Sequence, residues 1–86
     1  MMKENFSNIT DEELKIFYAD VSKRVKQLRI KASMTQLDLS LEIGIKSVAF
    51  YSNCENNRYG KHFNLEHVYK ISKVFNIPLS VFFEPL

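Results

Sequence analysis

The stretch TQLDLSLEIGIKSVAFYSNCE, residues Thr35–Glu55, decides how this chain folds. It divides into two short segments on either side of Gly44, a residue type that readily adopts the left-handed backbone of a tight turn. Ser40 is a small residue at the place where two such helices would cross. A helix, a glycine-centred turn and a second helix in this order predict a helix-turn-helix arrangement.

Capping signals predict where three helices begin. Thr10 with Glu13 and Thr35 with Asp38 have the spacing of a capping box, and Asn64 is a favourable cap for a later helix. Apolar residues flank each cap as a hydrophobic staple, in the pairs Ile9 and Leu14, Met34 and Leu39, and Phe63 and Val68.

Apolar residues recur at intervals of three or four in segments separated by polar residues. The pattern predicts helices over residues 11–31, 36–43, 48–56 and 65–75, a polar basic loop over 57–62, and a last short helix after Pro78. No strand pattern is present, so the expected fold is all-α, a compact bundle of five helices with an extended first helix. The residues expected to face the core are Leu14, Phe17, Tyr18, Val21, Val25, Leu28, Leu37, Leu39, Leu41, Ile43, Leu65, Val68, Ile71, Val74, Phe75, Leu79, Phe82 and Phe83.

Length and composition are those of one small domain. The 86 residues are 45% hydrophobic and include only two Gly and two Pro. The single cysteine, Cys54, allows no internal disulfide, which favours a reducing compartment. No apolar run is long enough to span a membrane, and the first residues lack the apolar core of a signal peptide, so we expect a cytoplasmic protein without a membrane partner.

Charge is distributed unevenly along the chain, although the net charge is only +2. Residues 1–20 hold two basic and five acidic side chains, a balance of −3, whereas residues 21–62 hold eight basic and three acidic ones, a balance of +5. The basic excess therefore lies on the segment that contains the predicted motif. Such a distribution is compatible with a nucleic-acid partner and also with an ordinary solvated surface.

No residue pattern typical of catalysis or metal binding is evident. Cys54, His62 and His67 are candidate zinc ligands, but they are widely spaced and lack a fourth ligand and a close pair. Glu12 and Glu13 are interpreted as charges that favour a helix start rather than as an acid–base pair. We therefore expect no enzyme activity, no cofactor and no metal.

On seven residues and its C-terminal tail, the chain resembles phage-repressor and Cro-type helix-turn-helix proteins of the xenobiotic-response-element class. The resemblance covers about residues 21–83. It implies a lambda-repressor-like DNA-binding domain over residues 21–86, with residues 1–20 as an N-terminal extension that merges into the first helix. The matching residues are Arg29, Thr35, Gln36, Leu39, Ser40, Gly44, Glu55 and the tail LEHVYKISKVFNIPLSVFF, Leu65–Phe83.

The distance from Gly44 to Glu55 departs from the family pattern by one residue. The glutamate stands eleven positions after the glycine, where the family has ten, so an ungapped match would put Cys54 in the place of the glutamate. One extra residue in the turn instead makes Tyr51 and Cys54 the buried pair and Ser47 the N-cap. We predict this gapped register because serine is a favourable cap.

In the gapped register, the resemblance implies that the second helix of the motif enters the DNA major groove. Asn53 is the best candidate for reading adenine, and Val48 and Ala49 are candidates for contact with thymine methyl groups. The base-reading residues would be Val48, Ala49, Ser52 and Asn53. The phosphate-binding residues would be Gln36, Lys46, Ser47, Asn57, Arg58, Tyr59 and Lys61. For each of them, an ordinary surface residue is the alternative.

Two further roles follow from the resemblance. Arg29 and Glu55 would form an internal salt bridge between the first helix and the end of the third. The C-terminal residues Val81, Phe82, Phe83 and Leu86 would form a homodimer interface, with Phe82 and Phe83 closing the monomer core as the alternative. A second candidate interface is the start of the first helix, with Phe6, Phe17 and Tyr18.

The expected function is therefore that of a sequence-specific DNA-binding transcriptional regulator. As a homodimer it would bind double-stranded DNA at a two-fold symmetric operator and act as a small autoregulating repressor or controller protein. The alternative is a protein-interaction module that uses the same fold to bind a protein partner, for example an antitoxin.

Overall fold

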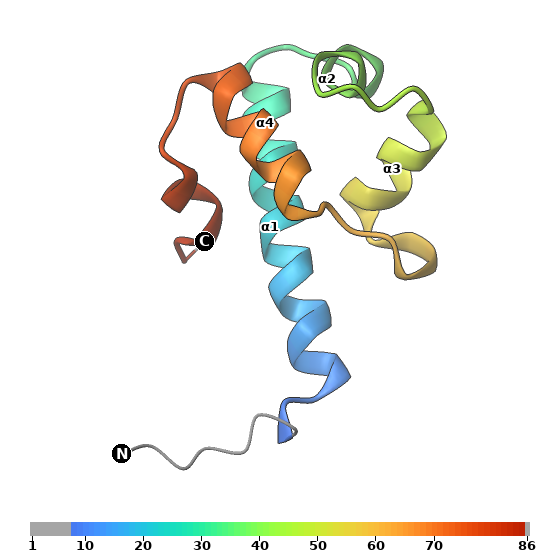
Figure 1. Cartoon of the computed structure of the whole chain (residues 1–86), viewed down its shortest axis with the longest axis vertical. Coiled ribbons are helices and arrows are strands. Elements are labelled where there is room, and N and C mark those ends of the chain that lie inside the picture. The colour runs from blue at the N-terminus through green and yellow to red at the C-terminus, as the bar shows by residue number, and fades with distance from the viewer. Residues whose placement is uncertain (1–7, 86) are drawn as a thin grey trace.

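The computed structural model describes residues 8–85 and is built from helices (Figure 1). Within these residues four α-helices are present and no strand, so the all-α prediction is confirmed. The elements are α1 (Asp11–Lys31), α2 (Gln36–Glu42), α3 (Val48–Asn56), the 3-10 turn η2 (Arg58–Gly60), α4 (Leu65–Phe75) and the 3-10 helix η3 (Leu79–Phe83).

The last short helix that we expected after Pro78 is the 3-10 helix η3, so the structure has four α-helices and the count of five is not confirmed within residues 8–85. It has five residues, and Glu84, the residue after it, is extended with φ −77° and ψ 151°. Pro85 explains this ending, because a residue that precedes proline is disfavoured in the α conformation.

Side-chain caps fix the predicted helix starts. The Asp38 N–H donates to Thr35 Oγ1 at 3.0 Å and the Thr35 N–H donates to Asp38 Oδ2 at 2.8 Å, which is a complete capping box. At α1, the Glu13 N–H donates to Thr10 Oγ1 at 3.1 Å, and the reciprocal bond of the expected box is not formed among the described residues. At α4, the His67 N–H donates to Asn64 Oδ1 at 2.8 Å. All three predicted helix starts are therefore confirmed, and at α1 only one of the two hydrogen bonds of the capping box is formed.

The helix α1 is longer than the body of the domain that covers it. Its C-terminal half packs against α3 and η3, whereas its first turns extend beyond the body of the domain (Figure 1). Val21 and Val25 are therefore buried, whereas Leu14 and Phe17 on the same apolar stripe are 45% and 48% exposed. The expectation that all of this stripe faces the core is wrong for its first two turns.

The core lies between α1, α2, α3, α4 and η3. Leu39 and Ile43 face it from α2, while Leu37 and Leu41 are exposed, because a helix of seven residues turns only one side to the core. Three expected core residues at the edges of the bundle, Leu65, Leu79 and Phe83, are also exposed. The buried apolar residues are Val21, Val25, Leu39, Ile43, Ile45, Tyr51, Cys54, Phe63, Val68, Ile71 and Phe82, and Leu28, Val74 and Phe75 pack partly against them.

The C-terminal segment is fastened to α1. The Arg24 guanidinium donates to the carbonyl oxygens of Glu84 and Pro85 at 3.4 and 3.0 Å, and Phe82 is 2% exposed. The tail therefore closes one side of the core. No helix within residues 8–85 is long and apolar enough to cross a membrane.

Candidate nucleic-acid interface

The turn between α2 and α3 begins where backbone N–H groups just after α2 form hydrogen bonds with carbonyl groups in its last turn. The Ile45 N–H donates to the Ser40 carbonyl at 2.8 Å and the Gly44 N–H donates to the Leu41 carbonyl at 3.2 Å, the pattern of a Schellman motif. Gly44 has a φ of +78°, in the left-handed region that suits glycine. The bend therefore depends on a glycine at this position.

Ser47 ends the turn and starts α3, which confirms the gapped register. Its hydroxyl accepts a hydrogen bond from the Phe50 N–H at 3.1 Å, as an N-cap does. Tyr51 and Cys54 are both fully buried, and Glu55 follows them at the end of the same face. The extra residue is thus absorbed in the turn, and α3 keeps a regular apolar side.

Glu55 joins α3 to α1 and α2 through both of its carboxylate oxygens. Arg29 Nε donates to Oε2 and Arg29 Nη2 donates to Oε1, each at 2.9 Å, so the expected ion pair is present and bidentate. Tyr51 Oη donates to Oε2 at 2.7 Å, and Gln36 Nε2 donates to Oε1 at 3.2 Å. Because Glu55 is only 5% exposed, this network substitutes for the water that the carboxylate has lost.

The network keeps the pair charged. Burial raises the pKa of the Glu55 carboxyl, but hydrogen bonds from Arg29, Tyr51 and Gln36 outweigh burial, so the pKa lies below its ordinary value. The hydrogen bond to Glu55 in turn raises the pKa of Arg29. Burial, aided by the Glu55 carboxylate, also raises the pKa of the Tyr51 hydroxyl, which therefore remains a donor.

Of the four predicted base-reading residues, Ala49 and Asn53 lie on the side of α3 opposite its buried residues, Ser52 lies at the flank of that side, and Val48, three residues before Tyr51 and seven before Glu55, lies next to the buried side. Ala49 is exposed, Val48 is 41% exposed, and Ser52 and Asn53 are half-buried. The Asn56 amide donates to the Ser52 carbonyl at 2.9 Å and to its hydroxyl at 3.4 Å, so these two side chains bond within the helix. The outer side of α3 is therefore accessible from its first turn onward.

The predicted phosphate-binding residues fall into two groups. Lys46, Arg58, Tyr59 and Lys61 are exposed near the ends of α3, with Tyr59 83% exposed. The remaining three already bond within the protein through their side chains. These are Gln36, which donates to Glu55, Ser47, which caps α3, and Asn57, which donates to Ser22 Oγ at 3.2 Å.

The second group has structural roles that the sequence only partly indicated. Asn57 ends α3 in a left-handed conformation, with a φ of +54°, and its amide fastens that end to α1 through Ser22. Gln36 braces α3 through Glu55. The phosphate contacts of these residues stay predictions, with the backbone N–H groups of the helix starts as further candidates.

Phe50 and His67 form a contact that the sequence did not reveal. The Phe50 ring lies edge-on to the His67 ring, with 6.3 Å between the ring centroids. His67 also packs against Phe63, with 6.1 Å between the ring centroids. His67 Nδ1 accepts the Asn64 N–H at 3.1 Å, and Asn64 Oδ1 accepts the His67 N–H at 2.8 Å, a capping box with histidine in the place of glutamate or glutamine. The start of α4 thereby supports the first turn of α3.

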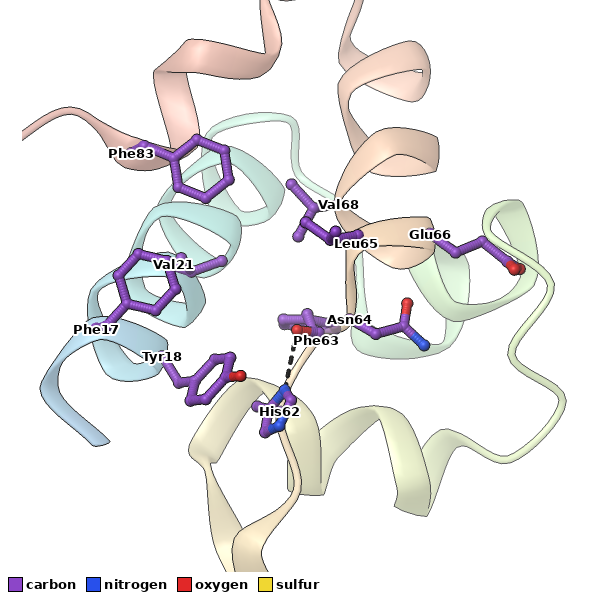
Figure 2. A pocket seen from close by; sticks show the side chains of 10 residues that line it. All are labelled: Phe17, Tyr18, Val21, His62, Phe63, Asn64, Leu65, Glu66, Val68 and Phe83. Atoms are coloured by element: carbon purple, nitrogen blue, oxygen red, sulfur yellow. Dashed lines mark hydrogen bonds between the residues drawn. The ribbon is translucent and has the colours of Figure 1, made fainter. Parts of the chain in front are cut away.

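A largely apolar groove of about 610 Å³ lies between the N-terminal half of α1, the start of α4 and η3 (Figure 2). The Phe17 ring faces the Phe83 ring, with 6.1 Å between the ring centroids, and the Tyr18 ring stacks on the His62 ring, with 3.6 Å between the ring centroids. Phe17 and Phe83 are each about half exposed. The groove is thus an apolar surface outside the predicted DNA-binding side chains.

The residues expected at a dimer interface differ in their placement. Phe82 is in the monomer core, so its side chain offers no surface and the expectation is corrected for this residue. Val81 is half-buried and Phe83 is on the groove, while Leu86 and Phe6 lie outside the described residues. Within residues 8–85, no group of three or more His, Cys, Asp or Glu side chains is arranged to hold a metal ion.

The comparison with known families agrees with this geometry. Residues 25–82 match a family model described as helix-turn-helix, which is 58 of the 86 residues and extends from the second half of α1 into η3. No curated protein and no solved structure shows significant similarity to the chain.

Proposed function

The chain belongs to the Cro-type helix-turn-helix family of DNA-binding transcription regulators, and we propose that it binds a specific double-stranded operator and acts there as a small autoregulating repressor or controller protein. The observation that carries this proposal is the fixed position of α3. Glu55 connects its end to α1 and α2, and Ser47 caps its start, while its outer side is left accessible.

Cationic side chains around α3 support binding to the DNA backbone. Lys46 stands just before α3, and Arg58 and Lys61 follow it in the loop that contains η2. All three are exposed, so a duplex against the outer side of α3 would have positive charges at both ends of the helix. Contacts of this kind hold the protein in register and make binding weaken as salt rises.

We propose that the functional unit is a homodimer and that a second copy of this chain covers the apolar groove. A two-fold symmetric dimer matches a two-fold symmetric operator, with half-sites about 34 Å apart. Charge supports an antiparallel pairing of two α1 helices, because their first turn is acidic and Lys23 and Lys26 follow in the middle of the same helix. Exposed apolar side chains of Leu14, Phe17 and Phe83 would be buried by such a pairing.

The test is fluorescence anisotropy of the full chain with the DNA upstream of its own gene and with a scrambled duplex of equal composition, each at two salt concentrations. We expect tight binding to the upstream DNA only, with an affinity that falls steeply as salt rises. Equal, weak binding to both duplexes would contradict a sequence-specific regulator.

Lys61→Ala separates backbone contacts from base contacts. We expect this variant to bind all duplexes more weakly and to reduce the slope of log affinity against log salt by about one. The matched control is Lys73→Ala on the last turn of α4, which removes the same charge at an exposed position away from α3. An unchanged slope for Lys61→Ala would remove this residue from the interface.

A protein-interaction function is the second candidate, and the apolar groove is the observation that favours it. As an antitoxin, the chain would present the groove, lined by Phe17, Tyr18 and Phe83, to a protein partner. A co-encoded neighbour that copurifies with the chain and is released by Phe83→Ser would support this function. Tight, salt-dependent operator binding by the chain alone would favour the regulator.

A further inference from the structure

The helix α3 lacks the side chains that most often bind guanine. Its nine residues, VAFYSNCEN, include no arginine, lysine or histidine, although arginine and lysine make the commonest specific contacts with guanine O6 and N7. Its one charged residue, Glu55, is 5% exposed and fully occupied by Arg29, Tyr51 and Gln36. The polar groups that α3 can offer a base are therefore limited to serine and asparagine.

Among these polar groups, Asn53 is the one left for a base. The Asn56 amide donates to both the carbonyl and the hydroxyl of Ser52, so two neighbouring polar side chains are engaged with each other. Within residues 8–85, the Asn53 amide makes no hydrogen bond, and it lies half-buried on the outer side of α3. An asparagine amide matches N6 and N7 of adenine in a bidentate pair.

The rest of the leading edge of α3 is apolar. Val48 and Ala49 occupy its first two positions, and Val48 and Phe50 are 41% and 37% exposed. The Phe50 ring rests against His67, so this first turn is supported from α4 and holds its apolar side chains in place. In the major groove the apolar group that a base presents is the C5 methyl of thymine.

We propose that the base pairs read by α3 are A·T pairs, with Asn53 on an adenine and with Val48 and Ala49 against the methyl groups of neighbouring thymines. This inference rests on the proposed function and adds the chemistry of the half-site. Discrimination against guanine and cytosine follows, because α3 has no arginine or lysine for the bidentate pair with guanine O6 and N7, and because cytosine has no C5 methyl group for Val48 or Ala49 to contact.

The test begins with duplexes selected by the full chain from a pool of random 30-base-pair DNA. Each thymine of the selected half-site is then replaced by deoxyuridine, which keeps Watson–Crick pairing and removes only the C5 methyl. We expect affinity to fall about fourfold for each thymine that touches Val48 or Ala49, the loss associated with one buried methyl-sized group. Replacing the contacted adenine by 7-deazaadenine should weaken the wild type and leave Asn53→Ala unaffected.

Val48→Ser tests whether the methyl effect belongs to this residue. The variant should bind the thymine and deoxyuridine duplexes with nearly equal affinity at one position of each half-site. The control Leu41→Ser makes the same kind of change at an apolar residue of α2 that is 62% exposed and does not line the apolar groove, and it should keep the full difference.

The outcomes separate the two proposals. A selected sequence with G·C pairs at the positions affected by Val48→Ser or Asn53→Ala would overturn the inference and leave the DNA-binding function intact. Equal affinity of the wild type for thymine and deoxyuridine duplexes would do the same. A pool that gains no sequence preference over successive rounds would contradict the proposed function itself.

Discussion

Glu55 connects three helices, and removing its main partner should expose the cost of a buried charge. Arg29→Met leaves the carboxylate with hydrogen bonds from Tyr51 and Gln36 but without a countercharge. We expect the free energy of unfolding to fall by about 3–5 kcal/mol, measured by urea denaturation.

A double variant distinguishes this cost from lost packing. Arg29→Met combined with Glu55→Leu removes both charges and keeps apolar volume at both positions. It should recover part of the stability lost in the single variant, since no unpaired charge remains buried. A double variant whose loss equals the sum of the two single losses would contradict the ion pair as the source.

His67 should make stability depend on pH above the range in which carboxylates titrate. Burial lowers its pKa from the ordinary value of about 6.5, and its Nδ1 must be unprotonated to accept the Asn64 N–H. The unfolded chain therefore binds the proton more readily, so stability is complete above about pH 6.5 and falls as pH drops through the folded pKa. Glu66, Lys70 and His62 are the charged or titratable groups that also influence this ring.

The measurement is the urea midpoint between about pH 7.5 and about pH 5.5. His67→Gln keeps a side chain that can complete the capping box and removes the titration, so its midpoint should vary less than that of the wild type. The Glu55 carboxyl contributes in a separate window, where stability present above about pH 4.3 is lost as pH falls.

At the scale of elements, the N-cap of α3 is the feature most directly connected to binding. Ser47→Ala leaves the Phe50 N–H without its acceptor and should destabilise the domain by about 1 kcal/mol. Operator affinity should fall as well, because the cap fixes the first turn that carries Val48 and Ala49. Thermal unfolding and anisotropy of the same variant give both values.

The cap of α1 provides the comparison. Thr10→Ala removes an equivalent hydrogen bond, to the Glu13 N–H, at the start of α1, whose first turns extend beyond the body of the domain. Thr10→Ala should leave unchanged the affinity of a single protein molecule for a duplex that contains one half-site. A similar loss of affinity in both variants would mean that the position of the α3 cap has no special importance.

Sequence patterns predicted the helix boundaries well because each depends on a few neighbouring residues. Thr35 with Asp38, Gly44 and Ser47 each satisfy backbone groups within five positions, so their effect is visible in the sequence. The extent to which a helix is covered depends instead on distant segments. Periodicity placed Leu14 and Leu65 on apolar stripes but did not indicate that their side chains would be 45% and 79% exposed.

In the candidate site, too, features that depend on neighbouring residues were predicted, and contacts between distant segments were missed. The ion pair between Arg29 and Glu55 was predicted from the resemblance, whereas the hydrogen bonds that Gln36 and Tyr51 add to Glu55 were found only in the structure. The contact between Phe50 and His67 was missed because it joins two helices and because histidine is an unusual member of a capping box. The last short helix after Pro78 was expected from apolar residues, but its 3-10 conformation was not predicted.

For the whole molecule, the groove predicts how the chain associates. Phe83→Ser removes one of the two facing rings without disturbing Phe82 in the core. If a second copy covers the groove, this variant should raise the dissociation constant of the dimer at least tenfold in sedimentation velocity experiments, as loss of a central aromatic residue does.

Leu41→Ser on α2 is the matched control, since Leu41 is 62% exposed and does not line the groove. It should associate as the wild type does. A Phe83→Ser variant with an unchanged dissociation constant would contradict this interface, and a wild type that remains monomeric at all concentrations would contradict the homodimer.

Because Cys54 is completely buried, the rate at which its thiol is labelled can report how often α3 separates from the core. The single thiol lies in the core side of α3, and its burial raises its pKa, so it reacts with a labelling reagent only while α3 is lifted from the core. The labelling rate of the unmodified chain therefore reports how often this one helix opens. A duplex that binds the closed helix should slow the reaction in proportion to its occupancy, without any dye or tag on either molecule.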